Sequence, residues 1–575
     1  MANEEAKVHE CDVLIIGGGL AGTYAAIKAK EFTDDIIIVD KAKIGKTGCS
    51  TFAAGVMLAP QPEDDLDVWT AEIAKKGNYL GDQEWTQVML KEQIENIDDL
   101  QSWGVEFEKD SEGKLVRVVG RGHEDTRMLM FHGPQFMKVM KGQIAKRNIN
   151  LVERVMITEL LTSDGQHPTS GSVVGAIGFN IRDGQFQIFK AKSVIIANGG
   201  VYGNYWGARN CTGDGIAMGY RVGAELYGME FAMPVDGWVF GRKYKCNQGL
   251  NMWVSNGAYL VNSKGERYME KYEPVIKERA RLAELILGLA KECAEGRGPV
   301  YMDMRHFSPE IWERFRRVIP YYMRIANIIE PWNQKVQYDF GAGAINAMTS
   351  GILNNLYCET NIPGLYVAGQ ASGFMPHGTY AVGGICLAMC TVGGRRAGRY
   401  AASYSKLSPE VEINESQLES LKNSSYAPMY VKDGIVPDEM FARIRQVAAV
   451  PYALFRNETK LNTLLSDLKE VTKLASQVSA DDSHVLARAN EVQNFLQCLS
   501  LIYAAALARK ETRGSHSRAD YPYRDDVNWL KRVVLRSEGD DRVGIRFEPI
   551  PIYRYRFKPA KLEKVVPLVP PVNIE

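Results

Sequence analysis

The sequence predicts an α/β fold in which several strands end in glycine-rich turns. Three features support this prediction. The short apolar run at 13–16 leads into a glycine-rich turn and then an alanine-rich segment that is typical of a helix. Two later apolar runs, 193–196 and 365–367, also end at glycine. Segments of helical periodicity dominate after residue 405. We therefore expect a domain of strands and helices followed by a mostly helical one.

The first chemical motif is "VLIIGGGLAGTYAAIKAKEFTDDIIIVD", at the N-terminus. Val13–Ile16 is short and rich in branched residues, which predicts a buried strand. Gly17, Gly19 and Gly22 follow in the G-x-G-x-x-G spacing, in which the first allows a tight turn, the second admits a pyrophosphate and the third lets helix and sheet pack closely. Asp40 ends the next strand, where a carboxylate accepts hydrogen bonds from ribose hydroxyls. This context predicts a Rossmann-like dinucleotide site.

Further glycine-rich segments favour FAD over NAD as the dinucleotide. They are "KAKIGKTGCSTFAAGV" after residue 40, "SVIIANGG" at 193–200, "CTGDGIAMGYRVGAEL" at 211–226 and "NIPGLYVAGQ" at 361–370. A single NAD site would not need so many separate turns feeding one sheet. A long FAD molecule lying across the sheet would.

The composition of the chain limits the classes of protein to which it can belong. The chain has 575 residues with 45% hydrophobic and 24% charged residues, which is ordinary for a globular protein of two or more domains. The formal net charge is zero, so no nucleic-acid partner is expected. The N-terminus is polar and acidic and no apolar run reaches about 18 residues, so we expect a cytoplasmic protein. Nine scattered cysteines without a CxxC pair indicate reduced thiols and no metal site.

These segments, together with "ARKETRGSHSRADYPYRDDVNWLKR" at 508–532, resemble the flavoprotein subunits of succinate dehydrogenases and fumarate reductases, with L-aspartate oxidases as close relatives. The resemblance covers nearly the whole chain. It implies FAD and a discontinuous Rossmann-like FAD-binding domain with an inserted α+β capping domain, followed by a helical domain and an irregular C-terminal tail. The expected bounds are 1–232 and 347–405 for the FAD domain, 233–346 for the cap, 406–510 for the helical domain and 511–575 for the C-terminal segment.

The resemblance, with the motif above, also implies which residues bind FAD. They are Gly17, Gly19, Leu20, Ala21, Gly22, Asp40, Lys41, Gly48, Ser50, Thr51, Ala53, Ala54, Gly55, Met156, Ala197, Asn198, Gly199, Asp214, Gln370, Ile385, Cys386 and Leu387. In the respiratory branch of the family a histidine is bonded covalently to the flavin. Ser50 stands at that position here, so we expect FAD to be held without a covalent bond.

The segment "PHGTYAVGGICL", 376–387, matches the family's turn over the flavin but lacks the arginine that clamps a substrate carboxylate. Ala381 occupies that position. Asn346 stands where the family has a substrate histidine, and no second histidine follows Met229. A buried dicarboxylate without these partners is costly. We therefore expect a small-molecule substrate other than succinate or fumarate.

One catalytic element of the family is an arginine of the capping domain that delivers or removes a proton. Arg281 is the better match and Arg279 lies close behind. An arginine needs carboxylates to relay a proton, and Glu278 and Glu284 are local candidates; a solvated helix face explains this segment equally well. His377 has two interpretations as well, since it could donate to flavin or substrate or hold the turn through the backbone.

The chain has no cysteine cluster for an iron–sulfur centre and no second dinucleotide motif. A flavin that takes up two electrons then needs a partner outside the chain to accept them. The resemblance implies that this partner is an iron–sulfur subunit with further redox subunits. Any contact with a membrane is expected only through these subunits. The mixed charge of "RADYPYRDDVNWLKR" suits a polar subunit interface. Arg513, His516 and Arg518 are interpreted as scaffold and subunit-facing charge.

The resemblance thus implies an FAD-dependent oxidoreductase that moves a hydride between flavin N5 and a substrate carbon. An unsaturated acid or a thioester is the leading substrate hypothesis. Two alternatives remain: a chain like the alpha subunit of adenylylsulfate reductase, or a flavoprotein that only relays electrons.

Overall fold

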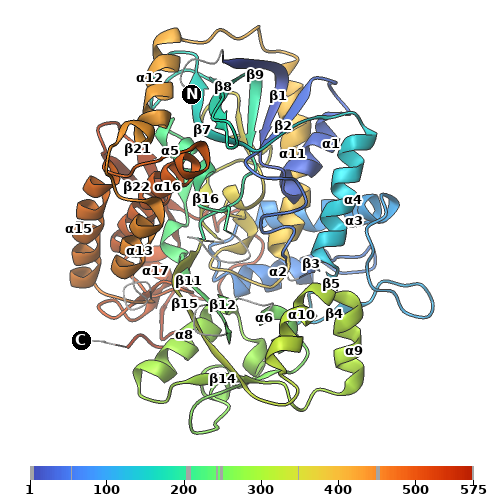
Figure 1. Ribbon diagram of the computed structural model, residues 1–575. Helices are drawn as coiled ribbons and strands as arrows, with labels where there is room; N and C mark the ends of the chain where they lie inside the picture. The colour runs from blue at the N-terminus through green and yellow to red at the C-terminus, as the bar shows by residue number, and fades with distance from the viewer. Residues whose placement is uncertain are drawn as a thin grey trace.

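The computed structural model describes residues 6–572 except 54, 203–208, 241–243, 247–249, 348 and 449–453. Its elements form three regions (Figure 1). A sheet with flanking helices lies at the top of the view, a smaller sheet with its helices lies below it, and a group of helices lies along the left side. In the described part of the chain, no helix combines the length and the apolar character that a membrane span requires.

The largest sheet of the described residues has seven strands in the order β6-β2-β1-β9-β8-β7, with β17 also paired to β9. The pairs among β6, β2, β1, β9 and β17 are parallel, whereas β7, β8 and β9 pair antiparallel. The strands are β1 (Lys7–Ile16), β2 (Ile36–Asp40), β6 (Asn150–Glu153), β7 (Val155–Thr162), β8 (Val173–Asn180), β9 (Phe186–Ile196) and β17 (Leu365–Val367).

The alternation of side chains along β1 places two different cores on the two faces of this sheet. Val13 and Ile15 pack with helices α1 (Leu20–Ala29), α3 (Gln83–Ser102), α4 (Gly133–Lys146) and α11 (Ile385–Ser405). Leu14 and Ile16 pack with α5 (Asp214–Arg221) and α16 (Ser483–Ala508) on the other face. Strands that are buried on both faces have the continuous apolar sequence seen here.

The second sheet has the order β12-β11-β15-β14-β13 and lies within residues 233–346, the range expected for the capping domain. A separate core of aromatic and aliphatic side chains joins this sheet to its helices. The elements are β11 (Met233–Phe240), β12 (Tyr244–Cys246), α6 (Leu250–Ser255), β13 (Tyr259–Val261), α7 (Met269–Tyr272), η3 (Lys277–Arg279), α8 (Leu282–Ala294), β14 (Val300–Asp303), α9 (Pro309–Val318), α10 (Pro320–Ile329) and β15 (Val336–Asn346).

Three smaller groups of elements lie outside these two sheets. A short sheet contains β3 (Val56–Leu58), β4 (Arg117–Val118) and β5 (Met128–Met130). Helix α2 (Leu66–Lys76) follows β3 in the chain. The helical region contains α12 (Glu415–Tyr426), α13 (Pro437–Val447), α15 (Glu458–Ala475) and α16. The C-terminal hairpin of β21 (Lys531–Ser537) and β22 (Val543–Pro549) joins β10 (Leu226–Tyr227) and β16 (Gly351–Ile352) in one sheet.

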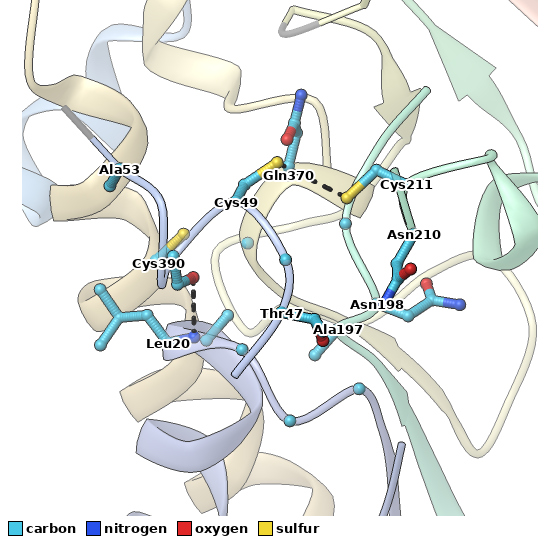
Figure 2. Close-up of a pocket in the computed structure, with 18 of the residues that line it drawn as sticks. Leu20, Thr47, Cys49, Ala53, Ala197, Asn198, Asn210, Cys211, Gln370 and Cys390 are labelled. Carbon is cyan, nitrogen blue, oxygen red and sulfur yellow. Dashed lines mark hydrogen bonds between the residues drawn. The ribbon is translucent and has the colours of Figure 1, made fainter. Parts of the chain in front are cut away.

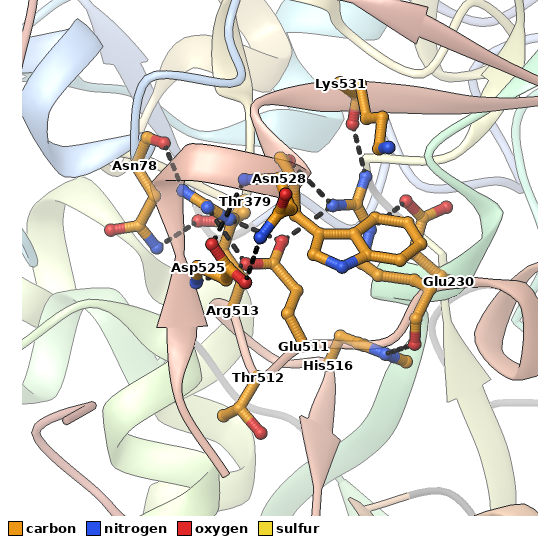
Figure 3. Close-up of polar contacts among 12 residues, drawn as sticks. Asn78, Glu230, Thr379, Glu511, Thr512, Arg513, His516, Asp525, Asn528 and Lys531 are labelled. Atoms are coloured by element: carbon orange, nitrogen blue, oxygen red, sulfur yellow. Dashed lines mark hydrogen bonds and ion pairs between the residues drawn. The ribbon is translucent and has the colours of Figure 1, made fainter. Parts of the chain in front are cut away.

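A buried network of charges holds the segment after α16 to the rest of the molecule (Figure 3). Arg509 Nε donates to Glu230 Oε1 at 2.8 Å, and Glu511 Oε1 accepts from both Arg509 Nη1 and Arg513 Nε at 2.7 Å. His516 Nδ1 lies 2.7 Å from Arg456 Nη1. Burial, and then the neighbouring arginine charges, lower the pKa of His516 well below its ordinary value, so the neutral ring accepts this bond.

This network corrects one sequence-based expectation. The side chains of Arg513, His516 and Arg518 are fully buried inside the chain, so the prediction that they face another subunit is wrong. Their scaffold role fits the structure, because buried charges require partners and these have them. The pairing could not be predicted, since Glu230 lies 279 residues before Arg509 in the sequence.

Candidate functional site

A cavity of about 300 Å³ opens where β1, β2 and β9 end. The stretches of chain in its wall include the turn after β1, the loop after β2, the start of β7, the loop after β9, the turn after β17, and the start of α11. Leu282 of α8 and Tyr322 of α10 reach it from the cap. Figure 2 shows the loop that carries Thr47 and Cys49 lying opposite the segment with Asn210 and Cys211.

The glycine turn after β1 lies against the end of β9 too closely for side chains. A Cβ on Gly17, whose φ is +112°, would lie 2.6 Å from the Ala197 carbonyl carbon. A Cβ on Gly22 would lie 1.9 Å from the Gly17 oxygen. These approaches match the packing roles that the motif assigns to its first and third glycines. Ser50 Oγ accepts from the Leu20 N–H at 3.0 Å, in the first turn of α1.

Asp40 ends β2 beside this turn. Its Oδ2 accepts from the Gly18 N–H and its Oδ1 from the Ala42 N–H, both at 2.7 Å. Burial raises the pKa of Asp40, and the two N–H groups oppose that rise. Each oxygen of an ionised carboxylate has room for a second donor, so Asp40 can hold the turn and still accept from a ribose hydroxyl.

Lys41 and Asp214 form the centre of a second polar cluster. Lys41 Nζ donates to Asp214 Oδ2 at 2.7 Å and to Glu491 Oε1 at 2.8 Å. Asn494 Nδ2 donates to the other Asp214 oxygen at 3.0 Å. Burial opposes the lysine charge, but the two carboxylates outweigh it and raise the pKa of Lys41. The cluster ties the loop after β2 to α5 and α16.

The cavity has the chemistry that an FAD molecule requires. Its wall includes the N-terminal turn of α1, Asp40, and Asn198, whose buried Oδ1 accepts no hydrogen bond from the residues that the structure describes. An orphaned buried acceptor indicates that a donor of a bound molecule belongs there. Phe374, Leu387 and other apolar side chains line other parts of the wall, as a flavin ring requires.

Most residues expected to bind FAD line this cavity. Those in its wall are Gly17, Gly19, Leu20, Ala21, Asp40, Lys41, Gly48, Ser50, Ala53, Met156, Ala197, Asn198, Gly199, Asp214, Gln370, Cys386 and Leu387. Gly22, Thr51, Gly55 and Ile385 lie in the supporting turns and helices outside the wall. Thr51 Oγ1 donates to the Thr47 carbonyl at 2.9 Å, for example. Ala54 lies outside the described residues.

His377 is fully buried beneath the turn, and its ring stacks on Tyr380 with 4.3 Å between centroids. Its Nδ1 accepts from the Ala381 N–H at 3.1 Å, so Nε2 carries the proton and donates to Cys386 Sγ at 3.3 Å. Burial lowers the pKa of His377 to about 3, so the ring is neutral. These contacts favour the role of holding the turn over that of donating to a substrate.

The two candidate arginines of the cap differ in their surroundings. Arg281 Nε donates to Glu284 Oε2 at 3.0 Å, and its guanidinium also bonds the Lys76 carbonyl. The Arg279 carbonyl accepts from the Gly122 N–H at 2.6 Å. Glu278 instead pairs with Arg267 at 2.7 Å. Of the two expected relay carboxylates, the structure therefore brings Glu284 to Arg281.

Arg121 is a cavity residue that sequence reasoning missed. It is buried, and its guanidinium carbon lies 5.0 Å from the Tyr380 ring centre with Nη2 3.3 Å from the hydroxyl. Its carbonyl accepts from the Gly383 N–H at 3.0 Å, and Gly122 packs against the Ala381 carbonyl. Arg121 thus reaches the turn that carries Ala381 from a different loop. The segment "VVGRGHED" contains no signal that would have identified it.

A buried carboxylate of the cap lies in the field of this arginine. Asp236, on β11, accepts from the Tyr338 hydroxyl. Burial raises the pKa of Asp236 to about 6, while the Arg121 charge opposes the rise. The side chain of Asn346, the expected substitute for a substrate histidine, is outside the described part of the structure. Within the described residues, no three His, Cys, Asp or Glu side chains gather in a way that would hold a metal.

Comparison with known families places two matches on the chain. Residues 12–387 match the family described as "FAD binding domain", and residues 442–563 match "Fumarate reductase flavoprotein C-term". The first match alone spans more than half of the chain.

Curated relatives resemble the chain over nearly its full length. A component of the fumarate reductase (CoM/CoB) of Methanothermobacter marburgensis is 29% identical over 93% of this chain and 98% of its own. The succinate dehydrogenase flavoprotein subunit of Rickettsia conorii is 27% identical over 98% of both chains.

Solved structures share the fold. E. coli quinol fumarate reductase FrdA aligns with a TM-score of 0.85 over 96% of this chain and 99% of its own, at 22% identity. The adenylylsulfate reductase of Archaeoglobus fulgidus aligns with a TM-score of 0.79 over 95% and 97%, also at 22% identity. The predicted α/β architecture is thereby confirmed.

Proposed function

Because this chain belongs to the succinate dehydrogenase and fumarate reductase family of FAD-dependent flavoprotein subunits, we propose that it oxidises or reduces a carbon–carbon bond of an acid or thioester with a single anionic group near the reacting carbons. FAD as the cofactor and oxidoreductase as the enzyme class follow from the family. The identity of the substrate is our proposal.

The proposal rests on the uncharged Ala381 in the turn and on Arg121, which reaches the same turn from another loop. The resembled family clamps a dicarboxylate with an arginine at the position of Ala381. Ala381 is buried and carries no charge, while Arg121 supplies one cation to the same turn from the loop after β4. One buried arginine matches one carboxylate or similar anion, since a guanidinium binds such a group through paired N–H donors.

The residues around Arg121 would shape how this anion is held. Tyr380 covers one side of the guanidinium and orients it. Asp236 is close enough to influence it electrostatically, which makes a second substrate anion near Asp236 unfavourable. These features support a substrate of one anionic group over a C4-dicarboxylate.

Bound FAD would supply hydride transfer at N5, and the chain's own groups would bind and enclose the substrate. Gly17, Gly19, Asp40, Lys41, Asn198 and Asp214 are the residues we propose to hold the cofactor, with Ser50 leaving it free of a covalent bond. Arg281, bonded to Glu284, is the proposed site for proton transfer because the carboxylate gives the guanidinium a relay partner. Arg279 remains the second candidate. Leu282 and Tyr322 exclude water from the cap side of the cavity.

We further propose that the electrons pass to an iron–sulfur subunit, then to further redox subunits. The support is the lack of a cysteine cluster in the sequence and the likeness to flavoprotein subunits. Purification at native abundance tests this. Co-purification of a cysteine-rich brown subunit would support it, whereas a lone chain that turns over at full rate with a soluble natural acceptor would contradict it.

Anaerobic reduction of the purified flavin by a panel of compounds tests the substrate. The panel contains saturated mono-acids, their thioesters, succinate, and sulfite with AMP. Flavin bleaching by a mono-acid or thioester, and not by succinate, supports the proposal. Bleaching by sulfite with AMP would instead favour chemistry like that of adenylylsulfate reductase, and no reaction with any compound would favour the electron-relay alternative.

A further inference from the structure

Two cysteines from distant parts of the chain meet inside the FAD cavity. Cys49 Sγ lies 3.5 Å from Cys211 Sγ, across 162 residues of sequence. Both line the cavity, and Figure 2 shows the two sulfurs pointing at one another across it. Cys211 is buried and Cys49 is half-buried.

Both cysteines are held in place by backbone contacts. The Tyr202 N–H donates to the Cys211 carbonyl at 2.9 Å, within a small bridge that also pairs Val201 with Thr212. On the other side, the Thr51 N–H donates to the Gly48 carbonyl at 3.2 Å and closes a turn around Cys49. The sulfurs therefore meet because the chain on either side of each cysteine is fixed by these contacts.

From this geometry we propose that Cys49 and Cys211 form a redox-active dithiol–disulfide pair that exchanges electrons with the bound FAD. The step joins Sγ to Sγ and breaks both S–H bonds. The two electrons and two protons that leave the thiols convert FAD to its two-electron-reduced form, and the reverse step restores the thiols. FAD is therefore the co-reactant, and the pair would store a second electron pair in the site.

The surroundings make the two thiols unequal in acidity. The contact with Cys49, in which either sulfur can donate, lowers the pKa of Cys211, with the Lys41 charge adding to it and burial opposing it. The same bond, together with burial, raises the pKa of Cys49. A thiolate beside a protonated thiol is the arrangement from which thiol–disulfide chemistry starts.

The sulfurs of Cys386 and Cys390 line the same cavity but have other contacts. Cys386 Sγ accepts from His377, and both thiols have a pKa raised by burial. These two cysteines are therefore inert in the proposed step and serve as internal comparisons.

Electron counting on the holoenzyme tests the proposal without a substrate. In an anaerobic dithionite titration, the wild-type protein should take up two more electrons per FAD than Cys49→Ser or Cys211→Ser. Cys390→Ser, which removes a cavity thiol outside the pair, should match the wild type. Any iron–sulfur partner adds equally to all four proteins, so the difference is unaffected.

Peptide mapping of the wild-type protein needs no variant. The protein is denatured in iodoacetamide without reductant, before and after the titration. A linked peptide containing Cys49 and Cys211 is expected from the oxidised protein, and two alkylated peptides are expected from the reduced one. Equal electron uptake in the wild type and the two serine variants, or alkylation of both cysteines in the fully oxidised protein, would overturn the proposal.

Discussion

The guanidinium of Arg121 stacks over the ring of Tyr380, 5.0 Å from guanidinium carbon to ring centre, beside the turn that carries Ala381. A cation held at this point by an aromatic ring keeps its donors directed rather than mobile. The Arg121 backbone is joined to this turn through the Gly383 N–H, and we propose that its charge takes the place of the arginine that the resembled family has at the position of Ala381.

Replacing Arg121 with glutamine should weaken binding of the anionic substrate. A charge-assisted hydrogen bond contributes about 1.5–3 kcal/mol, so KM should rise roughly ten- to a hundredfold. Arg117→Gln is the matched control, because Arg117 pairs with Asp64 in the loop before α2 and is not in the cavity wall. Steady-state kinetics with the substrate found in the panel give the measurement. Equal KM values for the two variants would remove Arg121 from the binding site.

FAD should be released by acid. Because Ser50 stands where the resembled family's respiratory branch has its covalent histidine, we expect no covalent bond between the chain and the flavin. Precipitation with acid is expected to leave yellow FAD in the supernatant. A fluorescent protein band on a denaturing gel, or flavin retained in the pellet, would contradict this expectation.

Lys41→Met should lower stability and loosen the cofactor site. The substitution leaves Asp214 as a buried carboxylate without its cation, while Glu491 keeps Arg488, and removal of one partner of a buried pair costs about 3–5 kcal/mol. Urea unfolding and the FAD content after gel filtration measure the two effects. Lys43→Met is the control, since Lys43 also lines the cavity but is outside this cluster. Equal losses in both variants would show that a general change of charge is responsible.

Asp236→Asn should gain stability relative to the wild type as pH rises. Burial raises the folded-state pKa of Asp236 to about 6, so between about pH 4 and 6 the folded state binds more protons than the unfolded state and loses stability with rising pH. The relative gain of the variant should approach at most about 3 kcal/mol by pH 7. The lost acceptor for Tyr338 reduces this gain at every pH without changing its slope.

Asp303→Asn should show the opposite dependence on pH: its stability relative to the wild type should fall as pH rises. A hydrogen bond from Arg305 lowers the pKa of Asp303, so this carboxylate stabilises the fold above the ordinary aspartate pKa and that stability is lost as pH falls. Chemical unfolding from about pH 2.5 to 7 compares the two variants, because the Asp303 contribution is lost only as pH falls below the ordinary aspartate pKa. Parallel pH profiles for both would contradict the assignment of Asp236.

The parts of the fold that depend on local patterns were predictable from the sequence. Gly17 and Gly22 revealed the dinucleotide turn because their spacing reflects contacts within one strand–helix unit. Arg121 and the Cys49–Cys211 pair were not predictable, because tertiary packing brings them to the cavity from loops without a recognisable motif. The charges near Arg513 were misinterpreted for a related reason: mixed charge indicates either a surface or a buried network, and only the fold distinguishes them.

The central claim is that the chain works on an anionic substrate other than a C4-dicarboxylate. The most direct measurement is anaerobic stopped-flow absorbance of the FAD-loaded protein, with succinate added to the oxidised flavin and fumarate added to the dithionite-reduced flavin. We expect neither compound to change the flavin spectrum on the timescale of turnover, while a mono-acid or thioester couple does. Rapid reoxidation of the reduced flavin by fumarate would contradict the account.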